Sequence, residues 1–343
     1  MIREVAAPVA ADEAIARAAP SPEGLAALDS LLGPHRLVGS GKGAIAVVLR
    51  YLAERGVLRS KLDEVMVADW IGYWVYDQIQ PFAFPAKRRS ERTRAILVYH
   101  QYGFPQDMDR ILAFAREHSL VVVEDCAHAL GGEYRGRRLG SLGDHSIWSF
   151  SKFFFCLALG AVGGADSELL DFADGAIGAA PAALSWLKDG AKLLYELTAG
   201  EAPGPASTVA GHALNMSYAI YGDALRPTEA ARALAAAKVT RELDCRRARY
   251  AHFRDRAGAL GTCDHLEERG VVPYVIPITV AEAARPRLVE RLRARGVATG
   301  VYRFDMARCL LAPRFEPVVW IPCHAGLSDL EFEGIIDDVR RTL

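Results

Sequence analysis

The sequence lacks an excess of charge of either sign and lacks long apolar runs. It has 41 Lys and Arg against 42 Asp and Glu, a net charge of −1. A polyanion partner needs a basic surface, so we expect no nucleic-acid partner. Every apolar run is shorter than the ~18 residues of a membrane span, and the first 20 residues lack the apolar core of a secretory signal. We therefore expect no membrane segment.

Cysteine is also scarce, and its placement is irregular. The six cysteines form no C-x-x-C pair and no Cys/His spacing of the kind that zinc requires; they are Cys126, Cys156, Cys245, Cys263, Cys309 and Cys323. We expect no metal site and reduced thiols, as in a cytoplasmic protein. With 343 residues, 51% of them apolar, the chain is long enough to bury one large core or two smaller ones.

The most informative stretch runs from residue 121 to residue 164. A buried-strand run, 120–124, ends on Asp125, and a second apolar run, 146–150, is followed closely by Lys152. In open α/β sheets, ligands bind where parallel strands end. A carboxylate and an amine at neighbouring strand ends suit a cofactor that is cationic at one end and electrophilic at the other. Pyridoxal phosphate has both properties.

A parallel sheet is expected on separate grounds. Residues 95–100 form an apolar strand run, and the segment from Asp107 has an acidic cap followed by helical apolar spacing. Together with strand 120–124 they make one βαβ unit, which places the two strands in parallel.

Glycines surround Ser40 just before a helical run. The segment 39–43 reads GSGKG, and free backbone N–H groups at a helix start after glycines bind anions. The same letters echo a nucleotide-binding P-loop. That motif wants a glycine at position 36 and Ser or Thr after the lysine, whereas Arg36 and Gly43 stand there. We therefore expect this turn to bind a phosphate group without being a nucleotide-binding P-loop.

Several motifs occur together and in a characteristic order. They read Glu124-Asp125-x-Ala127-x-Ala129-x-Gly131, then Gly136 to Gly140-Ser141-x-Gly143-Asp144, then Ser149-Phe150-x-Lys152, then Gly163-Gly164. This pattern resembles the DegT/StrS family of pyridoxal-phosphate-dependent sugar aminotransferases.

The resemblance implies a fold and a domain plan. The expected fold is the α/β fold-type I of such transferases, a mainly parallel sheet with helices on both faces plus a small C-terminal α/β subdomain. We expect an N-terminal helical segment over 1–30 and a large cofactor-binding domain over 31–225. A long helix and a small C-terminal domain would occupy 226–343.

The resemblance also implies roles for individual residues. Lys152 is expected to be the buried lysine that carries pyridoxal 5'-phosphate, with Asp125 paired to the pyridine nitrogen. Glu124 would face the opposite side of its strand as a structural neighbour. His128 would hydrogen-bond the ring hydroxyl or lie near the lysine, and Ser149 would donate to the phosphate. Structural roles for His128 and Ser149 stay open.

Further cofactor contacts are expected from two segments. Ser40, Gly41, Lys42 and Gly43 correspond to the turn that holds the phosphate, although Lys42 replaces a usual threonine and Gly43 a common alanine. Lys42 either adds charge to that site or points to solvent. Trp70 is expected to stack on the pyridine ring, with an ordinary place in the core as the alternative.

The implied function is an aminotransferase. It would take an amino group from an amino acid, glutamate or glutamine, and give it to a keto sugar, in a nucleotide-linked form or as a similar keto substrate. A homodimer is also implied. The segment 80–95 is shorter than in typical relatives, and the Asn-x-Arg signature before Pro227 is reduced to Arg226. A lyase, decarboxylase or oxidase on a smaller substrate and a non-catalytic pyridoxal-phosphate-binding regulator therefore stay as alternatives.

Overall fold

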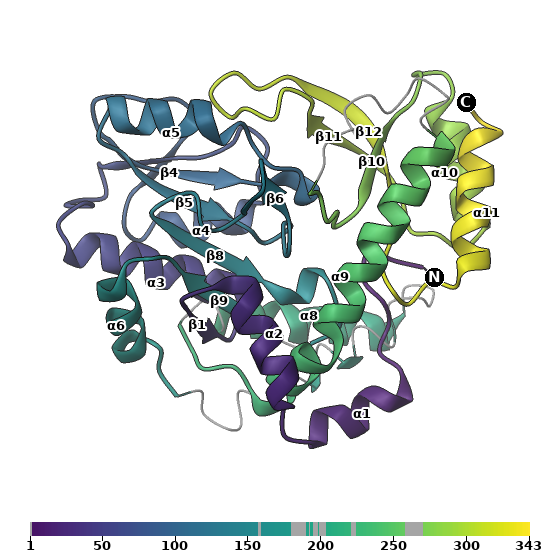
Figure 1. Ribbon diagram of the computed structural model, residues 1–343, viewed down its shortest axis with the longest axis horizontal. Coiled ribbons are helices and arrows are strands. Elements are labelled where there is room, and N and C mark those ends of the chain that lie inside the picture. Colours follow the sequence, from purple (N-terminus) through teal and green to yellow (C-terminus); the bar gives the residue numbers. More distant parts are fainter. Residues whose placement is uncertain are drawn as a thin grey trace.

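The structure, a computed structural model, describes most of the chain (Figure 1). The described residues are 2–156, 159–179, 190–191, 193–194, 198, 204–220, 224–257 and 270–343. Cys263 and parts of the Ala- and Gly-rich span 175–224 lie outside them.

A seven-stranded sheet forms the larger part, in the order β1-β9-β8-β5-β4-β2-β3. The strands β8, β5, β4, β2 and β3 are parallel, whereas β9 runs antiparallel to both of its neighbours. Their bounds are β1 His35–Val38, β2 Glu64–Met66, β3 Phe84–Ala86, β4 Thr93–Tyr99, β5 Val121–Asp125, β8 His145–Ser149 and β9 Gly160–Gly163. The predicted mainly parallel sheet is confirmed.

The predicted βαβ unit is β4, α5 (Met108–Glu117) and β5. The side chain of Asp107 caps α5 by accepting from the backbone N–H of Arg110 at 3.3 Å, as an acidic cap should. In the register of the two strands, Tyr99 lies opposite Asp125. The strand ends therefore bring a phenol and a carboxylate to one edge of the sheet.

Helices cover both faces of this sheet, as predicted. One face packs on α2 (Pro22–Leu32), α5 and α9 (Glu229–Ala257), and the other on α3 (Gly41–Glu54), α4 (Tyr73–Ile79) and α6 (Ser167–Ala176). Each strand alternates between the two cores: Ile96 and Val98 enter the first, and Ala95 and Leu97 the second. Helix α1 (Ala10–Arg17) packs beside α9, as α2 does, so both N-terminal helices fold back on the body.

A separate hydrophobic core belongs to the C-terminal part. It lies between the antiparallel sheet β10-β12-β11 and the helices α10 and α11, and α9 contributes Tyr250 and Phe253. The bounds are β10 Ile276–Thr279, β11 Val301–Asp305, β12 Phe315–Ile321, α10 Arg285–Ala294 and α11 Asp329–Arg340. In Figure 1, α9 runs from the large sheet to α10 and α11.

The remaining elements are short or partly described. They are the hairpin strands β6 (Glu133–Tyr134) and β7 (Arg137–Arg138), helix α8 (Pro205–Ile220), and the 3-10 helices η1 (Gln101–Gly103) and η2 (Phe150–Lys152). Within the described part of the chain, we find no helix that combines the length and the apolar character needed to cross a membrane.

One local prediction was wrong. The sequence run 296–302 predicts a strand, but β11 begins only at Val301, and Val297 instead forms an isolated bridge with Ile2. The polar, proline-bounded segment 80–94 contains the edge strand β3, with Pro85 inside it. Proline is tolerated at an edge, where its missing N–H leaves no ladder bond unmade.

Candidate functional site

The start of α3 lies against the end of β8. Ser40 caps the helix: its Oγ accepts from the backbone N–H of Gly43 at 2.9 Å. A Cβ at Gly41 would lie 2.8 Å from Cβ of Ser149, and a Cβ at Gly160 only 2.5 Å from the carbonyl carbon of Ser40. Small residues are thus needed where helix and strand ends meet. The result is a set of N–H groups beside the hydroxyl-bearing Ser149.

Alanine at Gly160 should disturb this junction. The new Cβ would meet backbone atoms of Ser40 and Gly41, and such overpacking costs about 1–3 kcal/mol. We expect the Gly160→Ala variant to lose that much free energy of unfolding in urea denaturation. Gly175 in α6, with open space around its Cβ position, is the control, and Gly175→Ala should be neutral or slightly stabilising. Equal stability of the two variants would contradict the close approach.

Lys42 lies at this helix start rather than pointing wholly to solvent. It is half-buried, and its Nζ is 3.4 Å from the centroid of the Trp74 ring. Burial lowers the pKa of Lys42 to about 8; nearby Lys152 acts in the same direction and Asp77 opposes it. Lys42 and Lys152 are thus close enough for their charges to interact.

Asp125 is a buried carboxyl at the end of β5, 3% exposed. Its Oδ1 accepts from the backbone N–H of Ala127 at 3.0 Å. Burial raises the pKa of Asp125 to about 6, while that hydrogen bond and the charges of His100 and Lys152 oppose the rise. A cation that reached this carboxyl would find an acceptor held in a poorly solvated place.

Lys152 ends the 3-10 helix η2 immediately after β8. We predicted a buried side chain from its phenylalanine neighbours, and this was wrong: Phe150 and Phe153 are buried, whereas Lys152 is exposed. The tight turn of η2 sends the two aromatic rings into the core and the lysine to the opposite side. Its charge nevertheless acts on Lys42 and on Asp125.

His128 lies within a cluster of tyrosines. Its Nδ1 is 2.6 Å from the hydroxyl of Tyr99 at the end of β4, and its ring stacks on Tyr274 at 4.3 Å between centroids. Burial lowers the pKa of His128 well below its usual value, and Lys152 acts in the same direction. A neutral imidazole that accepts from Tyr99 at Nδ1 carries its proton on Nε2.

Glu124, on the opposite side of β5, has the structural role we predicted. Its Oε1 accepts from the backbone N–H groups of Leu142 and Gly143 at 2.6 and 2.7 Å. Its Oε2 accepts from the backbone N–H of Gly140 at 2.9 Å and lies 3.1 Å from Nε2 of His100. His100, Glu124 and Cys126 could in principle ligate a metal. The hydrogen bonds already engage both carboxylate oxygens, so we assign the cluster to holding the 140–143 turn.

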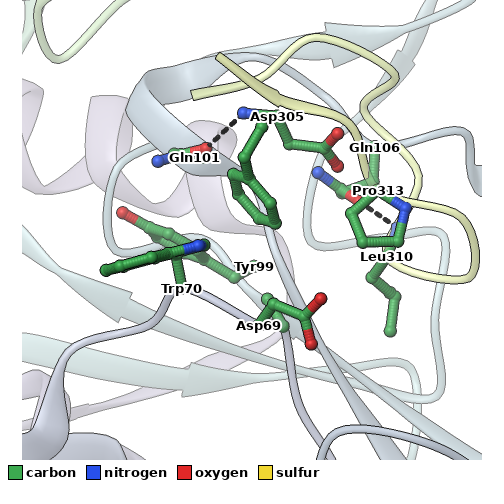
Figure 2. A pocket seen from close by; sticks show the side chains of 10 residues that line it. Asp69, Trp70, Tyr99, Gln101, Gln106, Asp305, Leu310 and Pro313 are labelled. Atoms are coloured by element: carbon green, nitrogen blue, oxygen red, sulfur yellow. Dashed lines mark hydrogen bonds between the residues drawn. The ribbon is translucent and has the colours of Figure 1, made fainter. Parts of the chain in front are cut away.

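Trp70 is 54% exposed and lies outside the hydrophobic cores. It packs against Phe315, and the guanidinium of Arg303 lies 5.2 Å from its ring centroid. Trp70 and Tyr99 line a small open pocket between the large sheet and the 305–315 segment (Figure 2). Tyr99 belongs both to this pocket and to the His128 cluster. The stacking of Trp70 on a pyridine ring stays a prediction.

Hydrogen bonds hold the far wall of this pocket. Gln101 accepts from the backbone N–H of Asp305 at 3.0 Å, and Gln106 accepts from that of Leu310 at 2.8 Å (Figure 2). Both glutamines come from the large part and both acceptor bonds reach the C-terminal part. The pocket is therefore built by residues some 200 positions apart in the chain.

The structure brings most of the predicted residues together. Lys152 interacts electrostatically with Lys42, Asp125 and His128, and Gly41 adjoins Ser149. Sequence reasoning missed Tyr99 and Tyr274. Tyr99 could have been found near the end of the strand predicted over 95–100, whereas no local signal points to Tyr274.

Part of the chain matches a known protein family. Residues 87–173 match the model of the DegT/DnrJ/EryC1/StrS aminotransferase family, which confirms the resemblance over that segment. Over 86 residues the chain is 45% identical to UDP-N-acetyl-3-dehydro-alpha-D-glucosamine 3-aminotransferase of Acidithiobacillus ferrooxidans, covering 23% of this chain and 22% of that protein. The matched segments span only 16–22% of the length of the first three curated relatives.

Solved structures match over nearly the whole chain. An aminotransferase from Streptoalloteichus hindustanus has a TM-score of 0.67 at 19% identity, covering 100% of this chain and 98% of that one. An aminotransferase of pseudoaminic acid biosynthesis from Helicobacter pylori also has a TM-score of 0.67, at 17% identity and with 98% of each chain covered. The chain therefore has the fold-type I aminotransferase fold, as predicted.

Proposed function

We propose that the protein is a pyridoxal-phosphate-dependent aminotransferase that moves an amino group from an amino acid to a keto sugar or a similar keto substrate. The observation that carries the proposal is the convergence of Lys152, Asp125 and His128 at the ends of neighbouring parallel strands. These three come from the motifs that resemble the family, and residues 87–173, which match the family model, include them.

The residues present fit this cofactor. Asp125 is a buried carboxyl whose burial disfavours its charge, so a cationic pyridine nitrogen would supply the missing counter-charge. The start of α3, with Ser149 and half-buried Lys42 beside it, offers N–H groups and a cation to a phosphate. The glycines at 41 and 160 leave no room for a Cβ at that place. We propose Ser40, Gly41, Lys42, Gly43 and Ser149 as the phosphate cradle.

Each residue of the site would have its own role in the reaction. Pyridoxal phosphate, when bound, supplies an electron sink for the carbon that loses its proton. Asp125 would orient the ring and keep its nitrogen protonated. As a general base, the Nζ of Lys152 would take a proton from the reacting carbon of the amino donor. As a general acid, it would then return that proton to a neighbouring atom. Neutral His128, with Tyr99 behind it, would hold a polar substituent of the ring, and Trp70 would limit access of water from the pocket.

A donor-dependent change of the absorption spectrum tests this function. We expect protein loaded with pyridoxal phosphate to convert to the amine form of the cofactor when glutamate or glutamine is added without a keto acceptor, because the first half-reaction is complete by itself. A keto sugar should restore the starting spectrum. A lyase, decarboxylase or oxidase would leave the spectrum unchanged on glutamate, and a regulator would be yellow but inert with every amino donor.

We further propose that the acceptor is a sugar, carried by a nucleotide or free, and that the enzyme works in amino-sugar or natural-product biosynthesis as a cytoplasmic homodimer. The sugar is supported by the relative from Acidithiobacillus ferrooxidans, whose name specifies a UDP-linked glucosamine derivative. Free cysteines, at 126, 156, 245, 309 and 323 in the described chain, support a reducing compartment. Glutamate and glutamine follow from the resemblance alone.

A further inference from the structure

Helix α9 carries an arginine that solvent does not reach. Arg246 is 0% exposed, and its Nε donates to Oε1 of Glu242 one turn earlier at 2.6 Å. Glu242 is itself buried, and its other oxygen accepts from the backbone N–H of Ala325 at 3.1 Å. A buried ion pair is a weak source of stability, because desolvation offsets the attraction. Its geometry is therefore the feature to explain.

The rest of the guanidinium donates to backbone carbonyls from three separate segments. One Nη reaches the carbonyl of Phe153 at 3.0 Å and that of Glu4 at 3.2 Å; the other reaches Pro273 at 3.1 Å and Tyr274 at 2.5 Å. A planar fork with several fixed donors can hold such a set, whereas an ammonium cannot. Arg246 thus joins segments that are far apart in the sequence.

Two of these segments lead directly to the site. Phe153 follows Lys152, its buried ring lies 5.1 Å from the guanidinium carbon, and its carbonyl is the acceptor just named. Tyr274 stacks on His128 and contacts the ring of Phe153, with centroids 6.2 Å apart. The backbone after Lys152 and the ring behind His128 are therefore held by one side chain.

We propose that Arg246, paired with Glu242, is a positioning residue that fixes the Lys152 turn relative to the His128–Tyr274 stack. This inference rests on the proposed function, because it assigns Arg246 a role in the same reaction without contact with the reacting groups. The N-terminal segment is held by the same side chain, since the carbonyl of Glu4 accepts a hydrogen bond from one Nη of Arg246.

Hydrogen exchange of the apoprotein tests the positioning without any cofactor. In the Arg246→Lys variant we expect amides in 150–156 and 273–276 to exchange at least roughly tenfold faster, with strands β4 and β5 unchanged. Because an unpaired Glu242 could unfold that variant, a second variant combines Arg246→Met with Glu242→Gln, which removes both charges yet leaves an amide oxygen for Ala325. Arg241→Lys, an exposed position on the same helix, is the matched control.

Kinetics of the loaded enzyme provide the second readout. Misplacing a catalytic group by about 1 Å costs on the order of 100-fold, so kcat should fall roughly 10- to 100-fold while KM changes much less. Exchange and kcat equal to those of the Arg241→Lys control would overturn the proposal. So would faster exchange throughout the sheet with kcat reduced only in proportion to the folded fraction, since this indicates a purely structural role.

Two remaining outcomes are also decisive. If neither variant folds, exchange of the wild type decides: the proposal requires 150–156 to be protected as well as β5, and unprotected amides there overturn it. If the wild type does not transaminate, the proposed function fails. The exchange measurements on the apoprotein still report whether Arg246 holds the two segments, so the two failures are distinguishable.

Discussion

The Lys152→Ala variant is expected to lose transamination and the absorption band of lysine-bound cofactor while its fold stays intact. A lysine that relays the proton contributes roughly 10²–10⁴-fold to the rate by general acid–base catalysis alone. Lys152 is exposed at the end of η2, and exposed substitutions usually change stability by less than about 0.5 kcal/mol. The measurements are the spectrum with pyridoxal phosphate, the rate with glutamate and a urea unfolding curve.

Borohydride reduction followed by peptide mapping identifies the lysine directly. The wild type should carry the reduced cofactor on the peptide that contains Lys152, and Lys152→Ala should carry none. Lys61→Ala, at another exposed lysine, should behave as the wild type. Reduced cofactor on a different peptide of the wild type, such as the one that contains Lys42, would contradict the assignment of Lys152 as the cofactor-bearing lysine.

The Asp125→Asn variant is expected to be more stable than the wild type without cofactor and far less active with it. Burial raises the pKa of Asp125 from 3.8 to about 6, so between these pH values the folded state binds more protons than the unfolded state. The contribution of Asp125 to the stability of the apoprotein therefore falls as pH rises from about 4 to about 6. Two pKa units correspond to about 3 kcal/mol of the free energy of unfolding. The Asp125→Asn variant does not lose this free energy, because its side chain stays neutral.

Unfolding in urea at pH 4 and pH 8 checks this sign. We expect the two proteins to be similar at pH 4, and Asp125→Asn to be the more stable by up to about 3 kcal/mol at pH 8. With pyridoxal phosphate bound, the wild type should be the more active of the two proteins. Removing one partner of a buried charge pair costs about 3 kcal/mol or more, so kcat/KM should fall at least roughly 100-fold. Asp171→Asn on the exposed side of α6 should show neither effect.

A stability difference between Asp125→Asn and wild type that does not grow from pH 4 to pH 8, or equal activity of the two proteins, would contradict the role of this carboxyl. The expected pattern has a simple physical meaning. An acid that destabilises the apoprotein is kept in a place where only a bound cation makes its charge favourable, which is how a binding site differs from an ordinary core.

The sequence by itself determined the local features. Apolar runs of strand type and a capped helix predict β4, α5 and β5, because the side-chain period and the capping chemistry are local properties. Motif order predicted Asp125 and Lys152 at neighbouring strand ends. The strand boundary at Val301 and the edge strand β3 were not predictable, because they depend on which distant segment supplies the pairing partner.

Only the tertiary structure decided how the site is surrounded. The exposure of Lys152 follows from the turn of η2, and the half-buried place of Lys42 follows from its contact with Trp74. The Tyr274 ring reaches His128 across about 150 residues of chain, and Arg246 bonds carbonyls on both sides of that contact. Such contacts depend on packing in three dimensions, and no local pattern of residues encodes them.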